Sequence, residues 1–221
     1  LYASGGAHVE GALLTETLLK ASGARVIKEE VALTISDHDF QIAGESYDQV
    51  ILATGAWLGQ ILEPLDYQVD VRPQKGQLRD YQLDLDTDNY PVVMPEGELD
   101  IIPFQQGKIS MGATHENEMG FDLTVDQALL NQMEEEALTY YPELAKGTVV
   151  GERVGTRAYT SDFSPFWGGL PDQTGLYVAS GLGSSGLTTG PLIGWHLAQL
   201  VVGGNLRLDP ADYPVEQYVK K

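Results

Sequence analysis

Cysteine is absent from the 221 residues of this chain. Its absence excludes a disulfide framework, a thiolate metal site, a cysteine nucleophile and any cofactor attached through sulfur. Chains without disulfides are typical of reducing compartments, so we expect this protein to be cytoplasmic.

Positive charge is scarce: 13 Lys and Arg residues stand against 32 Asp and Glu residues, which gives a formal net charge of −19. The longest basic run is the pair Lys220-Lys221. Because phosphate binding requires clustered basic side chains, this composition excludes nucleic acid and anionic membrane surfaces as partners. The acidity indicates a well-solvated surface.

Long apolar runs and several catalytic motifs are also missing. No run of 18 apolar residues and no signal-like segment occurs, so no integral membrane segment is expected. The histidines at positions 8, 38, 115 and 196 lack metal-binding spacing, and the acidic run 134–136 is interpreted as a solvated helix face, so no metal site is predicted. Without a G-x-S-x-G motif, a hydrolase triad is not expected.

The two ends of the chain alternate between helix and strand patterns. Leu13, Leu14, Thr17 and Leu18 share one face of a predicted helix over residues 9–21, and Gly23 would stop it. A strand is predicted over 24–27, a hairpin over 29–44 with its turn at 37–38, and a strand buried on both faces over 47–55. Near the other end, a buried strand over 175–180 precedes a helix over 191–203.

The middle of the chain changes character. Strand patterns separated by Pro, Gly and Asp turns cover 69–83, 91–95, 100–104, 108–114 and 147–162. A helix is predicted over 126–144, with Leu129, Leu130, Met133 and Leu138 inward. The chain is therefore expected to be mixed α/β, with the two ends forming one layer and the antiparallel middle inserted as a second.

The segment 181–186 reads GLGSSG and matches the dinucleotide-binding pattern G-x-G-x-x-G through Gly181, Gly183 and Gly186. That pattern requires a second βα unit and an acidic residue about 20 positions on, but only the chain end follows. The segment can instead deliver backbone N–H groups and a helix start to a partly negative group. The alternative is a glycine turn needed only for packing.

Arg157 follows Gly155 in an apolar, aromatic stretch. Its guanidinium can hold a carboxylate through two parallel hydrogen bonds, or it can form a structural salt bridge with one of the many acids. Small residues at 53–55 end a strand where a planar group could approach the backbone. Four aromatic residues could line a pocket or belong to the core: Tyr159, Phe163, Phe166 and Trp167.

Four segments, in this order, resemble the later part of the D-amino acid oxidase family of flavoproteins: VILATGAW, VDVRPQKGQL, DIIPFQQGKISMGATHE, and RVGTRAYTSDFSPFWG leading into LYVASGLGSSGLTTGPLIG. The family includes glycine oxidase, sarcosine oxidase and D-amino acid dehydrogenase. The resemblance, over about residues 5–203, implies a discontinuous FAD-binding domain with an inserted substrate domain built on a large antiparallel sheet. We assign 1–68 and 151–221 to the former and 69–150 to the latter.

The resemblance also implies roles for individual residues. Arg157 would hold the substrate carboxylate, and Val31, opening the second strand, would contact the adenine through its backbone. The residues implied to bind FAD are Val31, Ala53, Thr54, Gly55, Trp57, Gly181, Gly183, Ser184, Ser185, Gly186, Leu187 and Thr188. The last six would lie against the flavin ring, where a helix start stabilises negative charge.

Three departures from the family pattern bear on the substrate. The family's phosphate-binding G-x-G-x-x-G is expected upstream of Leu1, so we interpret the chain as the later part of a longer polypeptide. Asp100 stands where glycine oxidase-like members carry a tyrosine that binds the carboxylate; an acid there would repel a carboxylate, so either the alignment slips or the substrate differs. Ser184 replaces a residue that is basic in some amine oxidases.

The function predicted from the sequence is FAD-dependent oxidation of an amine or D-amino acid, by hydride transfer to flavin N5. Two alternatives stay open: a 2-hydroxy acid dehydrogenase on the same scaffold, and a non-catalytic binding or subunit module. The expected partners are the small-molecule substrate and, as a possibility, a second copy of the chain. The 221-residue chain by itself is expected to be inactive and to bind FAD poorly.

Overall fold

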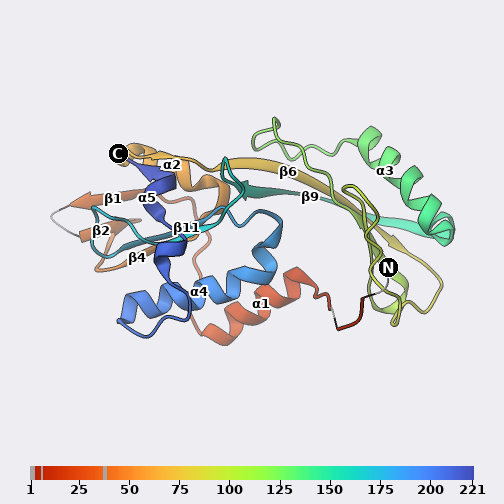
Figure 1. Cartoon of the computed structure of the whole chain (residues 1–221), viewed down its shortest axis with the longest axis horizontal. Coiled ribbons are helices and arrows are strands. Elements are labelled where there is room, and N and C mark those ends of the chain that lie inside the picture. The colour runs from red at the N-terminus through yellow and green to blue at the C-terminus, as the bar shows by residue number, and fades with distance from the viewer. Residues whose placement is uncertain (1–2, 6, 37–38) are drawn as a thin grey trace.

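The computed structural model describes residues 3–5, 7–36 and 39–221. Figure 1 shows an elongated molecule in which α1 and α4 lie below a set of short strands at one end, and α3 lies above a curved sheet at the other. Two long strands, β6 and β9, run from the first part into the second. The predicted hairpin turn at 37–38 lies outside the described residues.

The N-terminal helix α1 spans Gly11–Ser22, close to the prediction. The Glu10 carboxylate accepts a hydrogen bond from the Leu13 N–H at 2.7 Å, and Gly23 ends the helix with φ 64°. The predicted inward face is not covered, because no residue of α1 is buried. The strand predicted over 24–27 is wrong: this segment is unpaired extended chain, and Val26 is 66% exposed.

Two small sheets follow. The predicted hairpin forms and gains a third strand, giving the antiparallel order β1 (Leu33–Ser36), β2 (Asp39–Ile42), β3 (Glu45–Tyr47). The second sheet has the order β10 (Phe166–Gly169), β11 (Leu176–Ser180), β4 (Val50–Leu52), with β11 parallel to β4. β4 is covered on one face only, because Val50 and Leu52 are buried while Ile51 is 41% exposed.

Short helices and the C-terminal segment enclose the core beside these sheets. They are η1 (Gly55–Trp57), α2 (Leu58–Leu62), η2 (Glu63–Leu65), η6 (Pro210–Asp212) and α5 (Val215–Tyr218), with β5 (Gln68–Val69) paired to β12 (Val219–Lys220). Leu58, Leu62, Phe166 and Leu176 are fully buried there. The closing helix α4 (Gly186–Val202), which follows η5 (Gly183–Ser185), packs through Ile193 and Leu197 in a second cluster with Trp167. Phe166 and Trp167 therefore belong to the core.

The largest sheet is antiparallel, with the order β7-β8-β6-β9. Its strands are β6 (Arg72–Gln82), β7 (Asp100–Pro103), β8 (Lys108–Gly112) and β9 (Thr148–Tyr159), and η3 (Gln105–Gly107) joins β7 to β8. Four of the predicted middle strands are confirmed. The fifth, over 91–95, is reduced to an isolated bridge between Val93 and Ile101.

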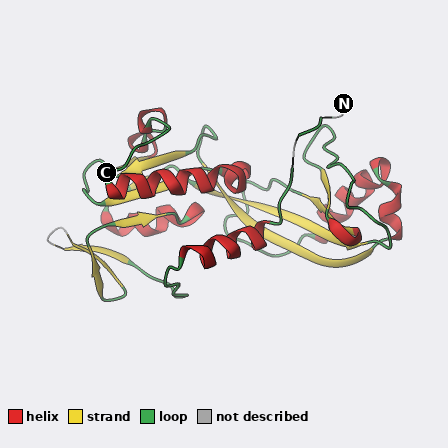
Figure 2. Cartoon of the chain, turned by 90° about the horizontal axis from the view of Figure 1, so that it is seen from below, coloured by secondary structure: helices red, strands yellow, loops and turns green. Residues whose placement is uncertain are grey.

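Helix α3 (Gln127–Tyr140) covers one face of this sheet and is followed by η4 (Pro142–Lys146), and Figure 2 shows the helix at the end opposite α4. The Asp126 carboxylate caps α3 by accepting from the Ala128 and Leu129 N–H groups. The acidic run is not all solvated: Glu134 accepts a 2.5 Å hydrogen bond from buried Arg79. A mixed α/β fold with a large antiparallel sheet is thus confirmed.

No helix in the described ranges has both the length and the apolarity that crossing a membrane requires.

Candidate active site

The face of the large sheet opposite α3 is polar. Residues paired directly across antiparallel strands share a face, and the register aligns Asp100, Gly112, Leu78 and Arg153 in one row across all four strands. Arg157 lies four residues along β9 from Arg153 and shares this face, which we call the open face. Asp80 lies two residues from Leu78 along β6, on the same face. Its carboxylate accepts two hydrogen bonds from Arg153, at 2.8 and 2.9 Å.

Arg157 is half-buried on the open face. Its Nη1 donates to the Thr114 carbonyl at 2.9 Å, and the guanidinium lies directly over Gly76, where an added Cβ would come within 2.3 Å of Nη1. Burial lowers the pKa of Arg157, yet the group stays cationic because the ordinary value is so high. No carboxylate of the described chain lies within ion-pair distance, so the structural salt bridge considered above is not formed.

The glycine segment leaves β11 as a tight turn into η5 and α4. Gly181 has φ 76° and an added Cβ would lie 2.8 Å from the Ser164 carbonyl oxygen; Gly183 has φ 52° and its Cβ would meet the Tyr159 ring at 2.8 Å. Gly186 has φ −56° and would meet only Leu182, at 3.6 Å. The first two glycines are therefore required by the packing of this chain itself, whereas the third is not.

The segment after β4 lies beside the glycine segment. Because β4 and β11 are parallel neighbours, residues 53–55 and 181–183 leave the same edge of the sheet, and the Ser180 hydroxyl donates to the Gly55 carbonyl at 2.9 Å. The Thr54 hydroxyl is buried and has no partner among the described residues. Trp57 is 43% exposed and stacks on Phe121, with ring centroids 4.8 Å apart.

Tyr159 connects Arg157 to this edge. It follows Arg157 by two residues on β9, and its hydroxyl lies 2.8 Å from the Ser184 hydroxyl. The structure thus brings Arg157 and the two segments that were predicted to bind the cofactor into one region. Val31 was predicted to open a strand; that is wrong, because β1 begins at Leu33 and Val31 is an exposed residue of the extended chain before it.

Glu98 adjoins Arg157 across the open face, where its charge raises the pKa of the guanidinium and partly opposes the effect of burial. The Glu98 carboxylate lies 3.4 Å from His115 Nδ1. Burial raises the pKa of Asp100 above its usual range, and the nearby His115 partly opposes that rise. Sequence reasoning missed Gly76 and His115. A glycine inside a strand indicates close approach of another group and could have identified Gly76.

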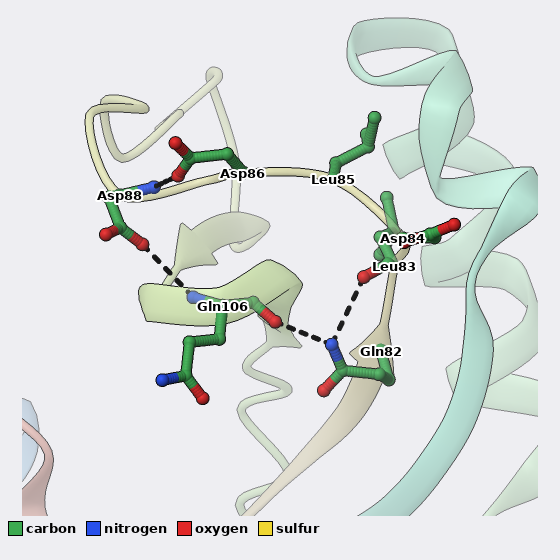
Figure 3. A pocket seen from close by; sticks show the side chains of 7 residues that line it. All are labelled: Gln82, Leu83, Asp84, Leu85, Asp86, Asp88 and Gln106. Carbon is green, nitrogen blue, oxygen red and sulfur yellow. Dashed lines mark hydrogen bonds between the residues drawn. The ribbon is translucent and has the colours of Figure 1, made fainter.

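A surface hollow lies elsewhere in the described chain. It has a volume of about 470 Å³ and lies where β6 runs into the following loop, beside Gln106. Figure 3 shows Asp84, Asp86 and Asp88 around it, with Asp88 accepting from the Gln106 N–H. No group of acidic or histidine side chains in the described ranges is arranged to hold a metal ion, and the hollow contains none of the predicted site residues.

Comparison with known proteins shows the family of this chain. The family model of FAD-dependent oxidoreductases matches residues 1–200. The chain belongs to this family. The chain is 40% identical to the uncharacterized oxidoreductase YurR of Bacillus subtilis, across 96% of this chain and 60% of YurR. It is 34% identical to the glycine oxidase of Pseudomonas aeruginosa, across 75% of this chain and 45% of that protein.

Solved structures of the same family superpose on the chain. Iminodiacetate oxidase from Chelativorans sp. BNC1 gives a TM-score of 0.86 at 33% identity, covering 91% of this chain and 57% of its own. Glycine oxidase from Geobacillus kaustophilus gives 0.77 at 24% identity, covering 84% and 51%, and shows the fold. The chain therefore spans about half to three fifths of the length of these relatives.

Proposed function

We propose that this chain contributes the substrate-binding sheet and part of the FAD site to an oxidoreductase acting on an amine or amino acid that carries a carboxylate. The observation that carries the proposal is Arg157, a half-buried guanidinium without a carboxylate partner in the described chain, fixed over Gly76. An incoming carboxylate would provide the missing counter-charge and take two parallel hydrogen bonds.

The names of the relatives support this substrate class. Glycine oxidase and iminodiacetate oxidase are named for compounds that combine an amine nitrogen with a carboxylate. These compounds share a carboxylate, and the fixed Arg157 guanidinium on the open face suits that group. We extend the proposal to glycine, iminodiacetate and D-amino acids as the compounds to test first.

The residues at the edge of the β4–β11 sheet fit an FAD. Thr54 offers a buried hydroxyl without a partner, and Gly55 and Gly183 leave backbone without side chains beside it. The start of α4 supplies backbone N–H groups and the positive end of the helix dipole. When bound, FAD supplies the hydride acceptor. Arg157 then holds the substrate carboxylate, and Tyr159 with Ser184 fixes the distance between β9 and the glycine segment.

An exposed apolar surface suggests where more of the FAD domain would pack. Partly exposed apolar residues occur on α1, the segment after it, β4 and α4: Leu13, Leu18, Val26, Ile27, Ile51, Leu187 and Leu192. We propose that 1–68 and 151–221 belong to that domain and 69–150 to the substrate domain. β9, which starts at Thr148, then passes from one to the other.

The proposal is tested by Arg157→Lys in the FAD-loaded full-length protein. The lysine keeps the charge but loses the planar pair of donors, so KM for every carboxylated amine should rise by about tenfold or more. Arg25→Lys is the matched control, because Arg25 forms only an exposed ion pair with Glu45 at 3.9 Å. Equal kinetics for the two variants, across glycine, iminodiacetate and a D-amino acid panel, would remove Arg157 from this role.

A further inference from the structure

Lys75 lies on the face of the large sheet opposite Arg157. It precedes Gly76, over which the guanidinium lies, so the alternation of a strand places the Lys75 side chain on the α3 face. The side chain is 1% exposed, and a lysine is almost never buried to this degree without a partner. Its Nζ has two partners, the carboxylates of Glu116 at 3.8 Å and Asp122 at 3.5 Å.

Glu116 connects this buried cation to Thr114, on the chain that continues from β8. The backbones of Lys75 and Glu116 exchange two hydrogen bonds, at 3.0 and 2.9 Å. One carboxylate oxygen of Glu116 faces Lys75. The other accepts hydrogen bonds from the Thr114 hydroxyl and the Gln77 side-chain amide, both at 2.7 Å. The Thr114 hydroxyl accepts in turn from the Gln77 backbone N–H at 2.9 Å, so the Thr114 side chain is held from the α3 face.

The Thr114 carbonyl orients Arg157 on the open face. It accepts from Nη1 of the guanidinium at 2.9 Å, and no other hydrogen bond engages this guanidinium within the described chain. Nε and Nη2, which lie side by side, therefore keep their donors for a ligand, in the arrangement that a carboxylate binds through two parallel hydrogen bonds. The direction of this free edge thus depends on a peptide group whose side chain is fixed on the other face of the sheet.

We propose that Glu116 is a positioning residue for the carboxylate site. Held by Lys75, it fixes the Thr114 peptide, whose carbonyl presents the free edge of the Arg157 guanidinium to the substrate. This inference rests on the proposed function. Gln77 is fully buried and Thr114 is 2% exposed, so little water reaches these hydrogen bonds, and the loss of one of them is transmitted to the guanidinium.

Two substitutions test this network in the FAD-loaded full-length protein. Thr114→Val keeps the shape of the side chain but removes its hydroxyl, and Glu116→Gln removes the charge that faces Lys75. Asp122 remains beside Lys75 in the second variant, so that chain should still fold.

The Kd of acetate, the simplest carboxylate probe of the Arg157 site, is measured by titration of the flavin absorbance, and kcat and KM are measured with glycine. Each variant should raise Kd and KM by about tenfold, because a mobile guanidinium loses its pre-oriented pair of donors. The effect on kcat should be much smaller, since saturating glycine orders the guanidinium again.

Thr114→Ser keeps the hydroxyl and should behave as the parent, and Glu118→Gln removes an exposed acid of the same loop and should change nothing. In an Arg157→Lys background, Thr114→Val and Glu116→Gln should not weaken either ligand further, because the group that they position is gone. Thermal unfolding of each variant detects a general loss of structure. If Thr114→Val does not fold, the result with Glu116→Gln decides.

This inference is overturned if Glu116→Gln binds acetate and glycine as Glu118→Gln does, or if its full effect persists in the Arg157→Lys background. Both results leave the proposed function standing. If Arg157→Lys by itself changes neither the binding of acetate nor the KM for glycine, the proposed function fails, and this inference fails with it.

Discussion

The glycine segment allows a sharp test, because two glycines of one motif stand in opposite environments. Gly183 has φ 52°, and an added Cβ would approach the Tyr159 ring to 2.8 Å; Gly186 has φ −56° and ordinary contact at 3.6 Å. We predict that Gly183→Ala strongly destabilises the chain, whereas Gly186→Ala does not.

The magnitude follows from two costs. Holding an alanine in the left-handed region costs about 1–2 kcal/mol. Moving the Tyr159 ring away breaks its hydrogen bond to Ser184, which contributes about 1 kcal/mol more. The expected loss for Gly183→Ala is therefore ~2–3 kcal/mol, or a Tm lower by about 4–12 °C for a chain of this size. Gly186→Ala replaces a glycine at a helix start and should gain up to about 1 kcal/mol.

The assay is urea and thermal unfolding of the 221-residue chain, followed by circular dichroism. Repeating Gly183→Ala in a Tyr159→Ala background separates the two costs, since only the backbone term of about 1–2 kcal/mol should then remain. A Gly183→Ala chain that melts within about 2 °C of the parent, or a Gly186→Ala chain that loses as much stability, would refute this reasoning.

Two further predictions concern buried polar groups. Burial raises the pKa of Tyr81 to about 12 from 10.0, so folding favours the neutral phenol. This contribution to the unfolding free energy is complete below pH 10 and is lost as the pH rises from 10 to about 12. Urea unfolding at each pH should therefore show a less steep loss of stability for Tyr81→Phe than for the parent chain. His196 is fully buried and stacked on Trp167, and neither ring nitrogen has a partner among the described residues, so His196→Phe should raise the unfolding free energy by about 1 kcal/mol or more. A less stable His196→Phe chain would indicate that a buried water satisfies those nitrogens.

Local patterns in the sequence predicted several elements well. Helices α1 and α3 were identified from their periodicity, and the end of α1 from Gly23. The four strands of the large sheet were identified from strand patterns between Pro, Gly and Asp turns. The strand over 24–27 failed, because a strand needs a neighbouring strand for its hydrogen bonds, and none of the described segments pairs with it.

The candidate site was predicted only in part. Arg157 and the glycine segment could be selected because arginine and G-x-G-x-x-G each indicate a limited set of uses. That Arg157 has no carboxylate partner in the described chain could not be predicted, since 32 acidic residues were available to it. His115, Glu98 and the support of Arg157 by Gly76 depend on contacts between different strands, which carry no local signal.

The sequence by itself determined the family, through ordered segments that also matched the family model over residues 1–200. Only the tertiary structure decided that Gly181 and Gly183 accommodate this chain's own Ser164 and Tyr159. It also decided which charges of the open face are left unpaired, since strand register, with a period of two residues, determines which side chains meet.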